Sequence, residues 1–186
     1  MSVDVVRRRF TVDEYLHMVQ AGILTEDDRV ELLDGEIVEM TPIGFPHAGS
    51  VAALVRVLVT GVGTRAVVWP QGPIRLSERS LPEPDVTLLR PRPVSYSDAA
   101  AVPSDVLLLI EVSDTSLGRA RELKLPLYAE AGIIEYWIVD VQGREIEVYT
   151  NPSGSRYGSV RRFGRGESVI PLAFPDLRIS VDEVSG

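Results

Sequence analysis

The sequence predicts a mixed α/β fold of the α+β kind, in which a mixed central β-sheet is flanked by helices. Three observations lead to this prediction. Short apolar runs, the clearest at residues 106–110, are typical of buried strands. Separate segments show helix signatures, and the last third of the chain alternates strand-like runs with turns, as an antiparallel meander does. A chain of 186 residues is expected to form one domain, spanning residues 1–186.

Two helices are expected in the first third of the chain. The first begins at Thr11, which forms a capping box with Glu14, and ends near Gly22. The second opens at His47 and continues to Gly61, because apolar side chains recur along it at helical spacing. At the positive end of this helix, His47 could contact a phosphate group or orient a carboxylate. It could equally serve packing and hydrogen bonding alone.

A β-hairpin is expected between these two helices. Asp34 and Gly35 supply the positive backbone dihedral angles of a tight turn between strands at residues 30–33 and 36–40. Glu31 lies on the first of these strands. The residues alone leave two interpretations of Glu31 open, a solvated strand carboxylate or a member of a functional site.

Four strands and a loop are expected in the middle of the chain. The strands lie at residues 65–69, 74–76, 86–89 and 106–110. The span 90–103 is too rich in proline to be regular throughout. A loop of this length is usually functional or mobile, so it could border a groove or form a subunit contact.

A third helix is expected at residues 117–131, after several potential capping side chains at residues 113–116. Pro126 removes an amide donor within this helix and crowds the preceding turn, which predicts a kink just past Lys124. A strand and an antiparallel meander follow, with a loop at 151–154. The expected strands are 135–141, 145–150, 157–163 and 169–170.

Two acidic side chains stand at the ends of apolar strands. Glu111 follows the run 106–110, Asp85 opens the strand 86–89, and Lys124 lies on the next helix. If the strands pair, these three side chains converge. Two like charges about 4 Å apart repel by roughly 4 kcal/mol at an effective dielectric constant near 20, and burying an unpaired carboxylate costs more. Such a cluster requires a lysine or a divalent cation, and oxygen ligands suit magnesium or manganese.

The order of these residues resembles that of a known family. The core matches are Pro84-Asp85, Glu111-Val112-Ser113, Lys124 and the run from Glu135 to Asp140. They are similar to the pattern of the Uma-type (Uma two) endonuclease family, within the restriction-endonuclease-like PD-(D/E)xK superfamily. Further matches extend the resemblance over nearly the whole chain, at residues 31–38, His47, Tyr128 and 132–133. No single piece is specific, but the ordered set is.

The resemblance implies a restriction-endonuclease-like core and hydrolysis of phosphodiester bonds in DNA. Asp85, Glu111 and the backbone carbonyl of Val112 would hold one or two magnesium ions, with manganese as the alternative. The resemblance also gives Glu31 a place in this metal site.

The remaining implied site residues assist the metal. Ser113 occupies the superfamily's lysine position, and in this branch the lysine is expected on the next helix, where Lys124 lies. Lys124 would orient the attacking water or stabilise the developing charge. His47 and Ser113 are the expected substrate or orienting contacts, and the protein is expected to be a homodimer.

Composition limits these expectations. The net charge of −8 and the pI near 4.8 argue against strong non-specific binding of nucleic acid, although arginine patches at 7–9, 90–92 and 161–165 could act locally or simply face water. The absence of cysteine excludes disulfides and thiolate metal sites. No run of 18 uninterrupted apolar residues and no signal peptide is recognisable, so we expect a cytoplasmic protein without a membrane partner.

Three alternatives remain open. The first is a nuclease-fold module that dimerises and acts in binding or regulation, with weak or no catalysis. The second is a buried ion network in which Lys124 only pairs with Glu111 and Asp85. The third, an acid pair of the glycosidase kind, has little support, because only Trp69 and Trp137 could contact sugars and both lie in strand-like runs.

Overall fold

The computed structural model describes residues 7–25, 27–94, 96–97 and 99–185. Its centre is a six-stranded sheet of order β3-β4-β5-β6-β7-β8. Strands β5 and β6 run parallel and the other neighbouring pairs are antiparallel, so the sheet is mixed, as predicted. The six strands are β3 (Val67–Pro70), β4 (Val86–Leu89), β5 (Val106–Ser113), β6 (Glu135–Asp140), β7 (Glu145–Ser153) and β8 (Arg156–Phe163).

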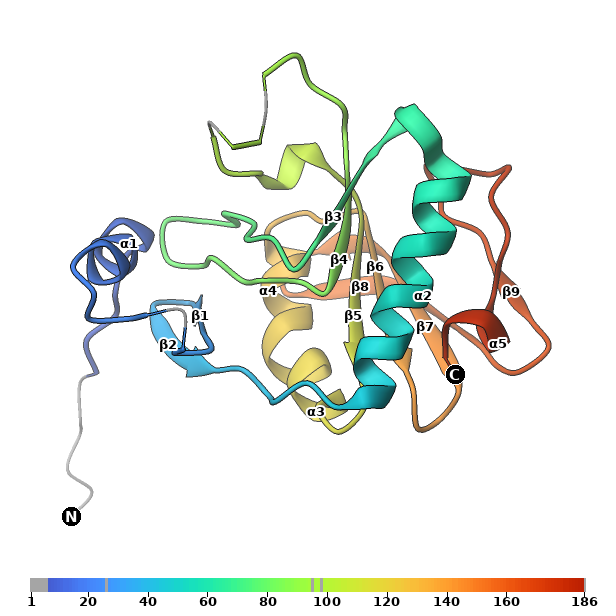
Figure 1. The fold of residues 1–186 in the computed structure, drawn as a ribbon, viewed down its shortest axis with the longest axis horizontal. Coiled ribbons are helices and arrows are strands. Elements are labelled where there is room, and N and C mark those ends of the chain that lie inside the picture. Colours follow the sequence, from blue (N-terminus) through green and yellow to red (C-terminus); the bar gives the residue numbers. More distant parts are fainter. Residues whose placement is uncertain (1–6, 26, 95, 98, 186) are drawn as a thin grey trace.

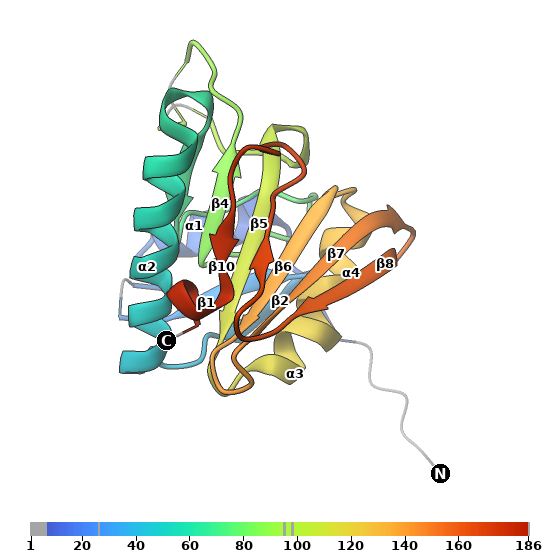
Figure 2. The same ribbon diagram turned by 90° about the vertical axis from the view of Figure 1, so that its right-hand side faces the viewer.

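Helices cover both faces of this sheet (Figures 1 and 2). Helix α2 (Phe45–Val62) packs on one face, where Leu54, Leu58 and Trp137 are buried in the larger apolar core. The opposite face carries a helical segment whose Ala120 and Tyr128 belong to a second core. This segment consists of α3 (Leu117–Arg119), the π-helical turn η3 (Ala120–Lys124) and α4 (Leu125–Glu130).

Helix α2 is both long and strongly apolar. By length and composition alone, the stretch Phe45–Arg65 could cross a membrane. Its buried side chains, however, pack against the sheet, as those of a core helix in a globular domain do. We therefore treat α2 as part of the core.

The N-terminal helix and hairpin form a small lobe with its own apolar core around Val12, Tyr15 and Leu32. The expected capping box is present, with the Thr11 hydroxyl accepting from the Glu14 amide and the Glu14 carboxylate accepting from the Thr11 amide. The hairpin turn is also confirmed, with positive φ angles at both of its residues. The elements of the lobe are α1 (Val12–Gln20), β1 (Val30–Leu33) and β2 (Glu36–Glu39).

Short elements complete the fold. The C-terminal strands β9 and β10 pair with each other, and α5 lies against α2 near the C-terminus (Figure 2). Their bounds are β9 (Ser168–Val169), β10 (Ile179–Ser180) and α5 (Val181–Val184), and the single turns are η1 (Gly63–Arg65) and η2 (Pro103–Asp105).

Two predictions of secondary structure are wrong, one for a strand and one for a loop. Residues 74–76 form no strand, because their amides donate in two directions instead of to one neighbouring strand. The Ile74 and Leu76 amides donate to Pro82 and Ser80 just after the following turn, whereas the Arg75 amide donates to Ala101. Burial of their apolar side chains does not require a ladder. The expected loop at 151–154 instead continues β7 to Ser153, since Asn151 adopts the left-handed conformation that asparagine tolerates.

The helix at 117–131 is continuous but irregular, and its irregularity precedes the expected kink. The Leu125 amide donates to the Ala120 carbonyl, five residues back, which produces the π turn. Pro126 follows directly and has no amide to donate, so the ladder is interrupted where the sequence predicts. The expected side-chain cap is absent, because Ser116 makes no capping hydrogen bond.

Candidate active site

Antiparallel pairing of β4 with β5 brings the two predicted acidic residues together. Val86 lies opposite Ile110, so Asp85 and Glu111 are neighbours at the same end of the two strands. The Asp85 carboxylate accepts a hydrogen bond from the Val112 amide through Oδ2, at 2.8 Å. Asp85 is thereby fixed against the strand that carries Glu111, which is buried at 7% exposure.

Lys124 contacts Glu111 from the helical segment that covers one face of the sheet. Its Nζ lies 2.9 Å from Glu111 Oε1 and 3.0 Å from Glu31 Oε2, and its side chain is buried. The π turn η3 contains Lys124, and π turns alter the direction of side chains relative to a regular helix. Lys124 is also the only lysine in the chain, since every other basic residue is arginine or histidine.

Glu31 is part of the cluster, so the solvated interpretation is wrong. Its carboxylate is buried on β1 and accepts from the Glu83 amide at 3.2 Å as well as from Lys124. The second oxygen, Oε1, is buried without a hydrogen-bond partner among the described residues. A buried carboxylate oxygen with no donor is costly, and it therefore suggests a missing partner.

Tyr128 is a site residue that the sequence interpretation did not assign. Its hydroxyl donates to Glu111 Oε1 at 2.6 Å from within the core. Tyr128 follows Lys124 by four residues, which places both side chains on one helix face. This spacing, combined with the buried strand acid opposite, was the available signal.

His47 and Ser113 differ in their relation to the cluster. His47 Nε2 lies 3.1 Å from Asp85 Oδ1, and this hydrogen bond raises the pKa of His47 although burial opposes the shift. The other ring nitrogen, Nδ1, is buried without a partner among the described residues. Ser113 is fully buried, with its Oγ 3.4 Å from Ser116 Oγ, and it does not line the pocket at the cluster.

The protonation balance of the cluster reflects three carboxylates and one lysine. Burial raises the pKa of Glu111 to about 7, with Lys124 opposing the shift and the charges of Asp85 and Glu31 adding to it. Burial lowers the pKa of Lys124, but the two carboxylates it contacts outweigh burial and raise it overall. Lys124 therefore stays charged, while Glu111 holds its negative charge only with difficulty.

The cluster opens to solvent through a pocket with a cavity of about 70 Å³. Asp85, Glu111 and Lys124 line it together with Asp114 and Arg119. The Arg119 guanidinium at the end of α3 donates to the Glu39 carbonyl, which ties this helix to the β1–β2 hairpin. The pocket thus lies where the N-terminal lobe, the start of α2 and the end of β5 meet.

Comparison with known proteins assigns a family to this arrangement. The model of the family Uma2, described as "Putative restriction endonuclease", matches residues 12–182. The chain belongs to the Uma2 family. No curated protein matches the chain. Among solved structures, the crystal structure of a "putative nuclease belonging to DUF820" from Anabaena variabilis is similar with a TM-score of 0.73 and 17% identity, covering 95% of this chain and 97% of that one.

The structural likeness confirms a restriction-endonuclease-like fold, and membership in Uma2 supports a nuclease. Within this Uma2 protein, Asp85, Glu111 and Lys124 come from two strands and a helix and meet as the sequence predicts. Perturbed pKa values in a pocket are typical of functional sites.

The carboxylate oxygens at the Uma2 site are of the kind that hard divalent cations prefer as ligands. Among the described residues, no three or more histidine, cysteine, aspartate or glutamate side chains form a group that could hold a metal ion, so a cage made of side chains alone is absent there. Magnesium does not require such a cage, because it keeps several waters and is usually held by one or two carboxylates plus substrate phosphate. Three carboxylates against one lysine also leave excess negative charge, and no donor among the described residues reaches Glu31 Oε1.

Proposed function

We propose that this Uma2 protein is a metal-dependent endonuclease that hydrolyses phosphodiester bonds in DNA. The observation that supports this best is the convergence of Asp85, Glu111 and Lys124 on one pocket, with Lys124 buried between two carboxylates. A protein rarely keeps two buried carboxylates on one lysine, with a third half-buried carboxylate beside them, for stability alone, because the mutual repulsion of the carboxylates is unfavourable.

Asp85 and Glu111 would hold the cation, with the backbone carbonyl of Val112 as a further donor and Glu31 in support. A bound magnesium or manganese ion lowers the pKa of a coordinated water and neutralises charge on the phosphate. His47 keeps Asp85 oriented through the bond to Oδ1, while the Val112 amide holds Oδ2. The carboxylate is therefore fixed at both oxygens before a substrate arrives.

Lys124 would supply the positive charge that stabilises the attacked phosphate or orients the water. Tyr128 donates to the Glu111 oxygen that Lys124 also contacts, so Glu111 stays in place if Lys124 turns toward substrate. This division of roles makes Tyr128 a positioning residue.

The decisive experiment measures cleavage of supercoiled plasmid in magnesium and in manganese. Glu111→Gln and Lys124→Met should lower the rate about 100-fold or more, the scale on which catalytic groups act. Glu122→Gln is the matched control, because Glu122 is exposed on the same helical turn. Undiminished, metal-dependent nicking by both Glu111→Gln and Lys124→Met would refute the assignment.

A metal-binding readout separates the site from its activity. Added magnesium or manganese should raise the melting temperature of the wild-type protein and of Glu122→Gln, because a ligand that binds only the folded state stabilises it. Glu111→Gln should show a much smaller shift. An equal shift in all three proteins would place the cation elsewhere.

The acidity of the chain supports a second candidate, a homodimeric binding or regulatory module with little catalysis. The net charge of −8 disfavours a tight grip on the DNA backbone. Several arginines are also engaged with acids, as in the pairs Arg9–Asp34 and Arg65–Asp176. Absence of metal binding by calorimetry, together with a dimer in sedimentation, would favour this candidate.

A further inference from the structure

A second cavity of about 470 Å³ adjoins the candidate active site. The two cavities share Arg29, Met40, Ile43 and Asp85 in their walls. The second cavity lies between the N-terminal lobe and the segment that leads into β4. Its volume falls in the range of about 300–1,000 Å³ that small-molecule sites occupy.

The walls of this cavity combine apolar surface with polar groups, among them the carboxylates of Asp28, Glu83 and Asp85. Val19 from α1, together with Met40 and Ile43 after the hairpin, supplies apolar surface, and Tyr15 adds an aromatic ring. The exposed side-chain amide of Gln71 lies at another edge, where the Gln71 backbone amide is anchored to the Asp85 carbonyl. Apolar faces with polar groups at the edge are what a planar heteroaromatic ring requires.

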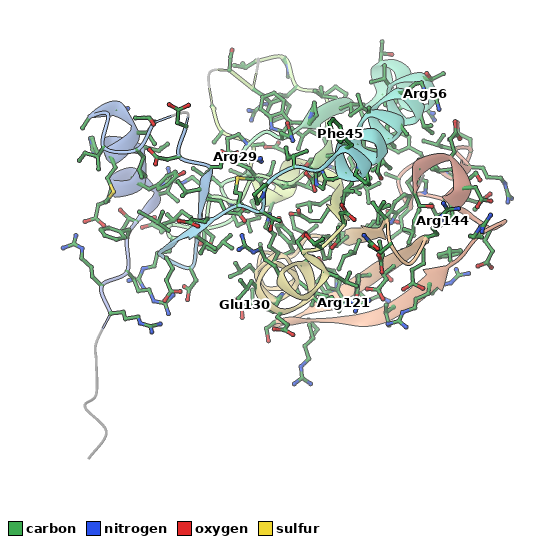
Figure 3. The ribbon with its side chains drawn as sticks, turned by 60° about the horizontal axis from the view of Figure 1, so that its bottom comes forward. Arg29, Phe45, Arg56, Arg121, Glu130 and Arg144 are labelled. Carbon is green, nitrogen blue, oxygen red and sulfur yellow. The ribbon has the colours of Figure 1, made fainter. Side chains whose placement is uncertain are left out.

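The two cavities are adjacent, because Asp85 lines both of them. A phosphate attacked at the carboxylate cluster is joined directly to the nucleosides on either side of it. The base of one of these nucleosides can therefore reach the second cavity. Arg29, which is exposed and borders both cavities, is placed to contact the phosphate between them. Figure 3 labels Arg29 and, at the start of α2, Phe45.

Charge and shape both disfavour an intact duplex here. A base within a double helix cannot enter a recess unless it leaves the stack, and single strands meet no such cost. An acidic chain gains little from the DNA backbone, so binding energy must come from contacts with bases. Phe45 is 97% exposed beside the first pocket, and an exposed ring of this kind suits stacking on a second base.

We infer that the second cavity holds the base of a nucleotide adjacent to the scissile bond, so that the substrate is single-stranded or locally unpaired DNA. This inference rests on the proposed nuclease function. It deepens that function by naming the substrate class and the subsite that selects it.

Two substitutions on α1 test the cavity with a matched control. Val19 and Leu16 are 45% and 40% exposed, respectively, but only Val19 lines the cavity. Val19→Trp should fill the cavity, whereas Leu16→Trp places the same ring on the same helix outside it. Melting curves of the two variants show whether both fold, and Val19→Phe with Leu16→Phe replaces the pair if the larger ring unfolds either one.

Binding is measured by fluorescence anisotropy in EDTA, with a labelled single strand, a perfect duplex, and a duplex containing one unpaired nucleotide. Wild type and Leu16→Trp should bind the single strand and the interrupted duplex about 10-fold more tightly than the perfect duplex, the value of roughly one stacked base. Val19→Trp should lose this preference. Equal affinity for all three nucleic acids, or identical behaviour of the two variants, would overturn the inference.

Cleavage of the same three substrates in magnesium separates this inference from the proposed function. If the binding preference appears and depends on Val19 but no substrate is cut, the subsite stands and the nuclease proposal fails. If all three substrates are cut at equal rates and Val19→Trp cuts like Leu16→Trp, the nuclease proposal stands and the subsite fails.

Discussion

Two buried glutamates on neighbouring parts of one sheet have opposite surroundings. Glu147 on β7 accepts hydrogen bonds from Arg121 through both oxygens and from the Tyr149 hydroxyl through Oε2, and its Oε1 forms an ion pair with Arg162 at 2.7 Å. Glu111 on β5 shares one lysine with Glu31 and faces the charge of Asp85. Burial raises both pKa values, but the donors around Glu147 outweigh it and lower the pKa of that group.

The contrast separates a structural ion pair from a candidate catalytic one. At Glu147 two arginines neutralise one carboxylate, and every oxygen has a donor. At the Uma2 site, acids outnumber the single lysine, and Glu31 Oε1 has no hydrogen-bond partner in the part of the chain that the structure describes. Burial alone does not identify a site, whereas burial with an uncompensated charge does.

The largest effect on stability is expected from Lys124→Met. This change leaves Glu31 and Glu111 buried without their shared cation, and the free energy of unfolding should fall by about 3–5 kcal/mol. Chemical denaturation in EDTA measures it, with Glu122→Gln as the control. A loss no greater than that of the control would mean that Lys124 does not hold the carboxylates together.

A smaller loss is expected for Glu147→Gln. The amide keeps one acceptor for Arg121 or Arg162 but loses the charge, and charge-assisted hydrogen bonds contribute about 1.5–3 kcal/mol. Both arginines are partly exposed and can turn toward water, which limits the penalty. Denaturation next to Glu145→Gln, on the same strand, gives the value. If Glu147→Gln also abolished cleavage at a temperature where it is folded, the division into scaffold and site would fail.

The sequence was sufficient to predict the pairing of Asp85 with Glu111 and the approach of Lys124. A strand that is apolar except for an acid at one end must bury its apolar residues and leave the acid at the edge of the core. This requirement fixes the register of β4 against β5 and brings the two acids together. The hairpin and the first capping box were equally predictable, because each depends on residues close in the chain.

Other features depend on partners distant in sequence. Glu31 can be buried because the Glu83 amide and Lys124 contact its carboxylate. Neither partner can be predicted from the sequence of the strand that carries Glu31. The segment 74–76 resembles a strand in composition, but its amides donate to two different segments, at residues 80–82 and at Ala101. The second cavity is likewise formed by four segments far apart in the chain, and no local pattern announces it.

The pH dependence of the Glu147 contribution should follow from its lowered pKa. A carboxyl whose pKa is lower in the folded than in the unfolded state stabilises the fold above the unfolded value, here 4.5, and loses that contribution as pH falls through the folded value. The difference in unfolding free energy between wild type and Glu147→Gln should therefore be full at pH 7 and shrink at pH 3.5. A constant difference would show that the arginines act on Glu147 without regard to its charge.

The smallest and most telling change is expected for Glu111→Gln in EDTA. The amide can still accept from Lys124 and Tyr128, while the repulsion by Asp85 and Glu31 disappears. The unfolding free energy at pH 8 should therefore stay within about 1 kcal/mol of wild type or rise, as is common where catalytic groups are replaced. If the cluster were instead a buried ion network that stabilises the fold, Glu111→Gln should clearly lower the unfolding free energy. This one measurement therefore distinguishes a catalytic site from a purely structural ion network.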